Sequence, residues 1–263
     1  MAATLDWEIH VIDIDSAFLN SEMPRDQPAY VKQPTGYEAK GKEHLVWLLL
    51  KALYGLKQSG YLWYNKLKSI LTTIGFRVSL ADPCVFYCAS TNGTSIIASH
   101  VDDLSLYCSS IPEIQCLKDE ISKHVSFKDQ GEMSHILGIE VICDHHMHTI
   151  SFSHHHYIDS MLKTFGLEDA NDVRTPATTG VNLSLADCPK SAEESQSMQN
   201  IPYQNAVGAL NHCAVMTRPN ISLAVQKVAK FAANPGYNHW FAVKRIFRYL
   251  KGTQNTILTV GAT

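Results

Sequence analysis

Two adjacent aspartates, Asp102 and Asp103, interrupt a stretch that otherwise predicts a buried β-hairpin. Apolar residues 96–98 precede the pair, and the alternating stretch 104–107 follows it. Neighbouring carboxylates repel each other and lose hydration when they leave water, so such a pair is costly within a packed sheet. Because side chains alternate along a strand, both carboxylates reach one site only through a tight turn. The stretch therefore predicts an antiparallel hairpin with the aspartates at its tip.

A second predicted strand, residues 8–13, ends on another aspartate, Asp13. Aspartates at strand ends suit a hard divalent cation, since Mg²⁺ takes oxygen ligands and usually only one or two protein carboxylates. Two such ions about 3.5–4 Å apart can hold the attacking and leaving oxygens of a phosphoryl transfer. The alternative is that the Asp102–Asp103 pair is a solvated turn, and the residues alone leave both interpretations open.

The composition limits the class of protein. The chain has 263 residues, 45% of them hydrophobic, which is enough for one elaborate domain or two small ones. A formal net charge of −3 gives no general attraction to nucleic acid, so a polyanion must meet a local basic surface. Seven cysteines without a CxxC pair favour a reduced, intracellular setting. No apolar run is long enough to span a membrane and no secretory signal is recognisable, so we expect no membrane partner.

The order of predicted elements indicates an α+β fold. Strands dominate the first 155 residues, with two helices among them and a hairpin turn at Asn92–Gly93. Helical patterns dominate the end of the chain. We expect an antiparallel sheet with packed helices, followed by a helical extension. The expected divisions are a sheet domain at 1–170, an exposed connector at 171–200 and a helical segment at 201–263.

Two further patterns allow more than one interpretation. Six histidines near a predicted hairpin tip could bind metal, but their irregular spacing favours a solvated polar turn; they are His145, His146, His148, His154, His155 and His156. The segment "HWFAVKRIFRYLKG", residues 239–252, predicts a basic amphipathic helix. Such a helix either lies along a nucleic-acid backbone or packs as an ordinary surface helix.

A series of ordered motifs resembles one known family. The segments "DIDSAFLN", "VKQPTGYE", "LLKALYGLKQSGYLWYNKL", "ADPCVF", "HVDD" and "LGIEV" occur here in the order found in Ty1/copia-type retrotransposon reverse transcriptases. The later segment that begins "TRPNISLAVQKVAKF" resembles the part that joins that polymerase to its RNase H domain. The resemblance implies a reverse-transcriptase-like palm, followed by a helical extension like a thumb or connection.

The resemblance also implies catalytic roles. Asp13 matches the first metal-binding aspartate, and Asp102 and Asp103 match the pair on the palm hairpin, so the three would hold Mg²⁺, with Mn²⁺ as a substitute. Three further residues match positions that bind nucleotide or template. Phe18 would lie beneath the incoming sugar and favour deoxynucleotides, Gln58 would contact nucleotide and template, and Lys128 would donate a proton near the leaving pyrophosphate.

The implied function is that of an RNA-directed DNA polymerase. Its partners would be template–primer nucleic acid, deoxynucleotides and other segments of a Pol polyprotein, such as integrase and RNase H, in a cytoplasmic virus-like particle or the nucleus. Relative to the family, His100 replaces a tyrosine, and the fingers segment and the RNase H motifs are not found. An inactive remnant that keeps the palm fold, and with it only nucleic-acid binding, is the first alternative. A metal-dependent nuclease or cyclase is the second.

Overall fold

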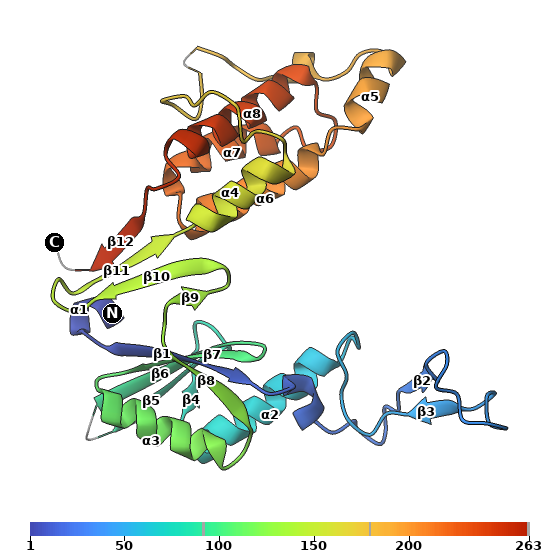
Figure 1. Cartoon of the computed structure of the whole chain (residues 1–263), viewed down its shortest axis with the longest axis vertical. Helices are drawn as coiled ribbons and strands as arrows, with labels where there is room; N and C mark the ends of the chain where they lie inside the picture. The colour runs from blue at the N-terminus through green and yellow to red at the C-terminus, as the bar shows by residue number, and fades with distance from the viewer. Residues whose placement is uncertain (91–92, 179, 262–263) are drawn as a thin grey trace. The chain divides into compact units, whose positions relative to one another are not determined.

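The structure, a computed structural model, describes residues 1–90, 93–178 and 180–261. It divides into two compact units, Met1–Met133 and Ser134–Thr263. In Figure 1 the first unit runs from blue to green, and the second from yellow-green to red. The fold of each unit is described separately.

The first unit contains a six-stranded antiparallel sheet (Figure 1). In spatial order its strands are β4 (Arg77–Val78), β5 (Val85–Ser90), β6 (Gly93–His100), β7 (Asp103–Cys108), β1 (Glu8–Ile14) and β8 (Phe127–Glu132). The strands β5 and β6 pair as neighbours. The predicted turn at Asn92–Gly93 falls between them, and Asn92 lies outside the described residues. The strand β1, predicted from its alternation, lies between β7 and β8.

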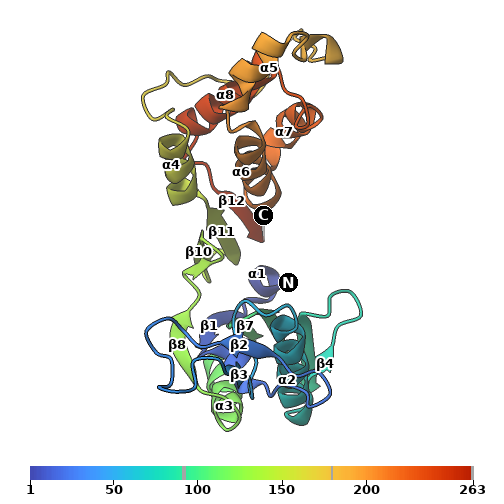
Figure 2. The ribbon, with the colours of Figure 1, turned by 90° about the vertical axis from the view of Figure 1, so that its right-hand side faces the viewer.

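Helices α2 (Ser59–Thr73) and α3 (Ile111–Ser122) cover one face of this sheet (Figure 2). Alternate strand residues are buried against them, including Ile12 and Ile14 of β1 and Leu104 of β7. Because side chains alternate between the faces of a strand, the residues between these positions point to the other face. The alternation therefore directs the aspartates of β1 and β7 away from the helices.

The rest of the first unit consists of short elements. They are α1 (Ala2–Leu5), the 3₁₀ turn η1 (Ala17–Asn20), and a two-stranded ribbon formed by β2 (Tyr30–Lys32) and β3 (Val46–Leu48). Several large apolar side chains of the ribbon and its flanks are exposed, among them Trp47 and Leu50. The segment of residues 30–48, which contains β2 and β3, is called the ribbon from here on.

The second unit combines a small antiparallel sheet with helices. Its strands, in spatial order, are β12 (Leu258–Gly261), β11 (Thr149–Ser153), β10 (Ile139–Asp144) and β9 (His135–Ile136). Its α-helices are α4 (His155–Thr164), α5 (Ala192–Gln199), α6 (Tyr203–Met216), α7 (Ser222–Ala229) and α8 (Tyr237–Gly252), with 3₁₀ turns η2 (Leu185–Asp187) and η3 (Pro219–Ile221). Residues of α4, α6, α7 and α8 share one apolar core.

The α+β prediction is confirmed at the level of helices combined with antiparallel sheets. The boundary between the compact units lies between Met133 and Ser134. In the second unit β11 pairs with β12 near the end of the chain. The division into a sheet domain at 1–170, a connector at 171–200 and a helical segment at 201–263 stays a prediction. The segment 171–200 contains η2 and α5, and Asn238 of α8 donates a hydrogen bond to Asp187 in it (2.7 Å). No helix among the described residues is long and apolar enough to cross a membrane.

Candidate active site

Asp13 lies directly opposite Asp103 where β1 pairs with β7. The Ile14 N–H donates to the Asp102 carbonyl oxygen (2.8 Å), so the hydrogen bonds of residue 14 point toward β7. Hydrogen-bonded and non-hydrogen-bonded pairs alternate along an antiparallel ladder, which makes Asp13 and Asp103 a non-hydrogen-bonded pair. In such pairs the Cα atoms are only about 4.5 Å apart and the side chains are close. The two carboxylates therefore share one site on the face opposite the helices.

Asp102 lies in the turn just before β7. A hydrogen bond from helix α2 to the neighbouring residue Val101 holds this turn. Val101 has a positive φ of 59°, a conformation that a β-branched residue rarely adopts. Its carbonyl oxygen accepts a hydrogen bond from the Trp63 indole Nε1 (2.5 Å), and Trp63 is a buried residue of α2. The predicted hairpin with aspartates at its tip is therefore present.

Tyr54 joins this group, although sequence reasoning did not single it out. Its hydroxyl donates to Asp102 Oδ2 (3.2 Å), and its ring centroid lies 4.3 Å from that of Phe18. Burial, followed by the charge of Asp102 and the hydrogen bond to it, raises the pKa of Tyr54. Tyr54 thereby links Phe18, in η1, to the turn. The signal in the sequence is its place in "ALYGLKQ", but no local pattern indicates a contact with a residue 48 positions away.

The electrostatics of the site favour a cation. Burial raises the pKa of Asp103, and the neighbouring charges of Asp102 and Asp13 raise it further. His100, the cross-strand partner of Asp103 in the hairpin, acts in the opposite direction. Like charges held this close disfavour ionisation, and a positive charge between them would relieve the repulsion.

A divalent metal ion fits the chemistry of these donors. In the described part of the chain, no group of three or more His, Cys, Asp or Glu side chains is arranged so that together they could hold a metal ion. Mg²⁺ prefers hard oxygen ligands, however, and commonly uses only one or two protein carboxylates. The raised pKa of Asp103 supports the fit, because a bound cation would offset the repulsion that contributes to it.

Two further predicted residues, Lys128 and Gln58, differ in how they are placed relative to the carboxylates. Lys128 of β8 is the direct cross-strand partner of Asp13, so its exposed side chain lies on the carboxylate face. Gln58 is the N-cap of α2 and is half-buried. Among the described residues, no hydrogen bond joins the Gln58 side chain to the aspartates, and its contact with nucleotide and template stays a prediction.

The histidine-rich segment is not one solvated turn throughout. His154 is buried, and its Nδ1 lies 2.8 Å from the Thr217 hydroxyl. Burial, followed by the charge of His212, lowers the pKa of His154 to about 4. His145 and His146, by contrast, lie exposed between β10 and β11. The expectation of a polar turn is therefore correct for the hairpin tip and wrong for His154, which is a core residue.

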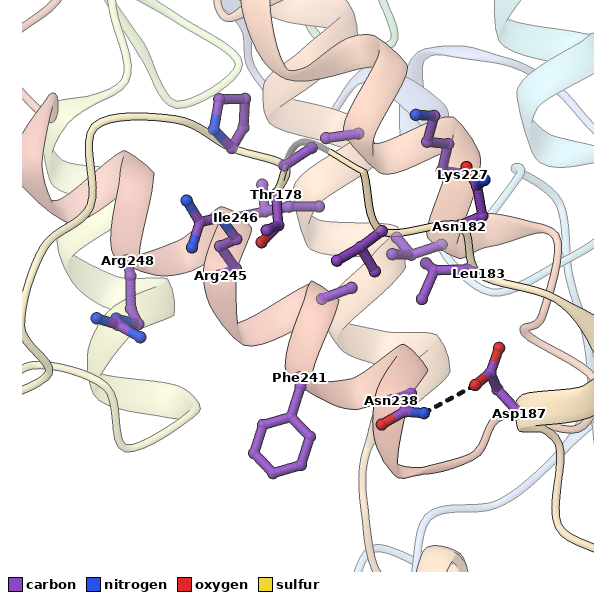
Figure 3. Close-up of a pocket in the computed structure, with 16 residues that line it drawn as sticks. Thr178, Asn182, Leu183, Asp187, Lys227, Asn238, Phe241, Arg245, Ile246 and Arg248 are labelled. Carbon is purple, nitrogen blue, oxygen red and sulfur yellow. Dashed lines mark hydrogen bonds between the residues drawn. The ribbon is translucent and has the colours of Figure 1, made fainter.

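A separate cavity of about 430 Å³ lies in the second unit, beside α7 and α8 (Figure 3). Its lining includes the basic residues Lys227, Arg245 and Arg248 of these helices. Two of these bind the connector, since Arg245 Nη2 donates to the Thr175 hydroxyl (2.9 Å) and Arg248 Nε donates to the Asn171 carbonyl (2.5 Å). The basic face of α8 thus serves at least in part as a structural contact, and phosphate binding there stays a prediction.

Comparison with known proteins identifies the family of this chain. Residues 1–179 match the family described as reverse transcriptase (RNA-dependent DNA polymerase). The match covers more than half of the chain, and the chain belongs to this family.

Its relatives include Pol polyproteins of Ty1/copia-type transposons, which confirms the resemblance. The Retrovirus-related Pol polyprotein from transposon TNT 1-94 of Nicotiana tabacum is 37% identical over 264 residues, covering 100% of this chain and 20% of the relative. The one from transposon RE1 of Arabidopsis thaliana is 33% identical, covering 97% and 17%. A transposon Ty5-1 protein of Saccharomyces cerevisiae is 32% identical, covering 94% and 77%. The chain thus spans about a fifth of the length of the first two relatives.

Proposed function

We propose that this chain is the palm and adjoining helical part of a copia-type reverse transcriptase that adds deoxynucleotides to a primer 3′-hydroxyl on an RNA or DNA template. The observation that carries the proposal is the cross-strand pairing of Asp13 with Asp103, with Asp102 at the adjoining turn. Membership of the reverse transcriptase family supports the same assignment. The compartment would be a cytoplasmic virus-like particle or the nucleus, with other Pol segments as partners.

The reaction forms one P–O bond and breaks another. The primer hydroxyl oxygen attacks the α-phosphorus, the bond to the β-phosphate breaks, and pyrophosphate leaves. Divalent ions held by Asp13, Asp102 and Asp103 would favour the ionised hydroxyl and neutralise phosphate charge. Lys128 lies on the same face and would give a proton to the leaving pyrophosphate.

Two aromatic residues would shape the nucleotide site. Phe18 would pack beneath the sugar, where its ring leaves no room for a 2′-hydroxyl, and its contact with Tyr54 holds the ring in place. The Tyr54 hydroxyl, by donating to Asp102 Oδ2, would orient that carboxylate. Tyr54 thus acts through Asp102 and Phe18, as a positioning residue.

A primer-extension assay tests the proposal. The assay uses a primed RNA template with deoxynucleotides and Mg²⁺ or Mn²⁺. Asp102→Asn should reduce extension at least about 100-fold, because the metal-binding charge is lost. Asp15→Asn is the matched control, since Asp15 is exposed, lies just beyond β1 and should leave the rate unchanged. Equal extension by Asp102→Asn and the wild-type chain would contradict the proposal.

The rival function is nucleic-acid binding without catalysis. The observation that favours it is His100, an imidazole opposite Asp103 where the family has a tyrosine. Under this alternative the wild-type chain would retain an oligonucleotide but extend no primer. Cleavage of nucleic acid without nucleotide addition would point instead to a nuclease.

A further inference from the structure

The pairing of β1 with β8 contains a β-bulge next to the candidate active site. Val11 of β1 pairs with Gly131 of β8. The next residue, Ile12, pairs with Asp129. Gln130 is therefore an extra residue in β8, and the register of the two strands differs by one on either side of it.

This bulge decides which charge faces Asp13. If the register of Val11 with Gly131 continued without the bulge, Asp129 would lie opposite Asp13. A slip of one residue moves every side chain of a strand to the other face, so Lys128 would point toward the helices. A third carboxylate would then replace the lysine beside Asp13 and Asp103. With the bulge, Lys128 lies opposite Asp13.

An ion pair between the buried Lys118 and the exposed Asp129 holds Asp129 on the helix side of the sheet. The Lys118 Nζ of α3 donates to both carboxylate oxygens of Asp129, at 2.7 and 2.8 Å, and lies 2.8 Å from His10 Nδ1. Lys118 is only 4% exposed. An ammonium only donates, so His10 Nδ1 accepts and the ring is neutral. Burial and the Lys118 charge, in that order, lower the pKa of His10, which is consistent with this state.

Besides Lys118, a backbone N–H within the bulge also binds Asp129. The Gly131 N–H donates to Asp129 Oδ1 (2.9 Å), and Gly131 has a φ of 75°, which glycine adopts without strain. Burial alone would raise the pKa of Asp129, but the hydrogen bonds from Lys118 and from the Gly131 N–H lower it. Asp129 is thus ionised and bound both to α3 and to the bulge.

We propose that Lys118 is a positioning residue for the polymerase site. By binding Asp129 from the helix side it fixes the bulge, and the bulge places the Lys128 ammonium opposite Asp13. The register part of this inference depends only on the strand pairing. The part about catalysis rests on the proposed function of Asp13 and Lys128.

The register is tested by NMR on the whole chain, labelled with ¹⁵N and ²H. Asp13 and Lys128 form a hydrogen-bonded pair, so their amide protons lie close enough for a cross-strand nuclear Overhauser effect. Lys118→Met should abolish this contact and give one between Asp13 and Asp129. The control is Lys123→Met, an exposed lysine just beyond α3 whose partner is the half-buried Glu120. An unchanged Asp13–Lys128 contact in Lys118→Met would overturn the proposal.

A second variant covers the case in which Lys118→Met fails to fold. Asp129→Ala removes the anchor from the half-exposed end of the pair, where the side chain is 47% exposed. It should also abolish the Asp13–Lys128 contact, since the bulge loses the bonds to Lys118 and Gly131. Retention of the contact in folded Asp129→Ala would count against the proposal as directly as retention in Lys118→Met.

Primer extension separates a positioning role from a general loss of stability. Lys118→Met and Lys128→Met should each lower the rate about tenfold or more, as expected for a displaced proton donor. The double variant should be no slower than Lys128→Met alone, because Lys118 acts through Lys128. Additive losses would overturn the positioning role. No extension by the wild-type chain would contradict the proposed function instead, and the NMR contact would still report the register.

Discussion

His154 makes the stability of the second unit depend on pH. The residue is 2% exposed, and burial together with His212 lowers its pKa from 6.5 to about 4. Below pH 6.5 His154 is therefore protonated in the unfolded chain, whereas in the folded chain it stays neutral down to about pH 4. The stability that neutral His154 provides is complete above pH 6.5 and is lost as the pH falls from 6.5 to about 4.

The size of the effect follows from the difference in pKa. Between pH 6.5 and pH 5, this histidine costs the folded state about 2 kcal/mol. Urea unfolding at pH 7 and pH 5 measures it, with His154→Gln expected to lose most of this pH dependence. His44→Gln, an exposed histidine of the first unit, is the control and should behave as wild type. An unchanged pH dependence in His154→Gln would contradict the assignment.

Arg218 holds the C-terminal end of α8. It is 1% exposed, and its guanidinium donates to the Thr253 carbonyl oxygen (2.9 Å) and hydroxyl (2.6 Å). Replacement by Ala would leave a cavity and unpaired polar groups, so we expect a loss of about 2–4 kcal/mol in the free energy of unfolding. Urea unfolding provides the measurement. Arg174→Ala, at an exposed site, should change the value by less than about 0.5 kcal/mol, and a similarly small change for Arg218→Ala would refute this role.

At the scale of elements, the ribbon should be the least protected part of the first unit. A two-stranded ribbon alone is marginally stable in water, and all three residues of β3 are exposed. By hydrogen exchange followed by mass spectrometry, the amides of β2 and β3 should exchange well before those of β1 and β7. Equally slow exchange in the ribbon and in the centre of the six-stranded sheet would contradict this expectation.

The sequence predicted the elements of the site better than their contacts. The strand that ends at Asp13 and the hairpin around Asp102 follow from local alternation of apolar residues. That Asp13 could lie on a strand beside this hairpin was one option from the residues, and the family resemblance favoured it. Local alternation could not decide it, because pairing between strands some 90 residues apart leaves no local pattern. The Tyr54 hydrogen bond and the bulge at Gln130 were missed for the same reason. The apolar run before α2 gave no sign that Trp47 would be exposed, because hydropathy does not reveal what covers a strand.

At the scale of the whole molecule, the compact units depend on contacts between distant parts of the chain. The sequence indicated a sheet region followed by helices, but the unit boundary at Met133 depends on the pairing of β11 with β12, which joins residues about 110 positions apart. The net charge of −3 means that any nucleic acid must be held by local contacts, including those through bound metal ions. In the proposed function, Asp13, Asp102 and Asp103 would hold these metal ions.

Paramagnetic broadening by Mn²⁺ tests most directly whether these carboxylates form one cation site. In NMR spectra of the labelled chain, less than one equivalent of Mn²⁺ should first broaden the amide signals of Asp13, Asp102 and Asp103. Asp13→Asn should abolish this early broadening, and Asp15→Asn should not. Broadening that begins instead at the histidine-rich turn between β10 and β11, with the aspartate signals unaffected, would contradict the account.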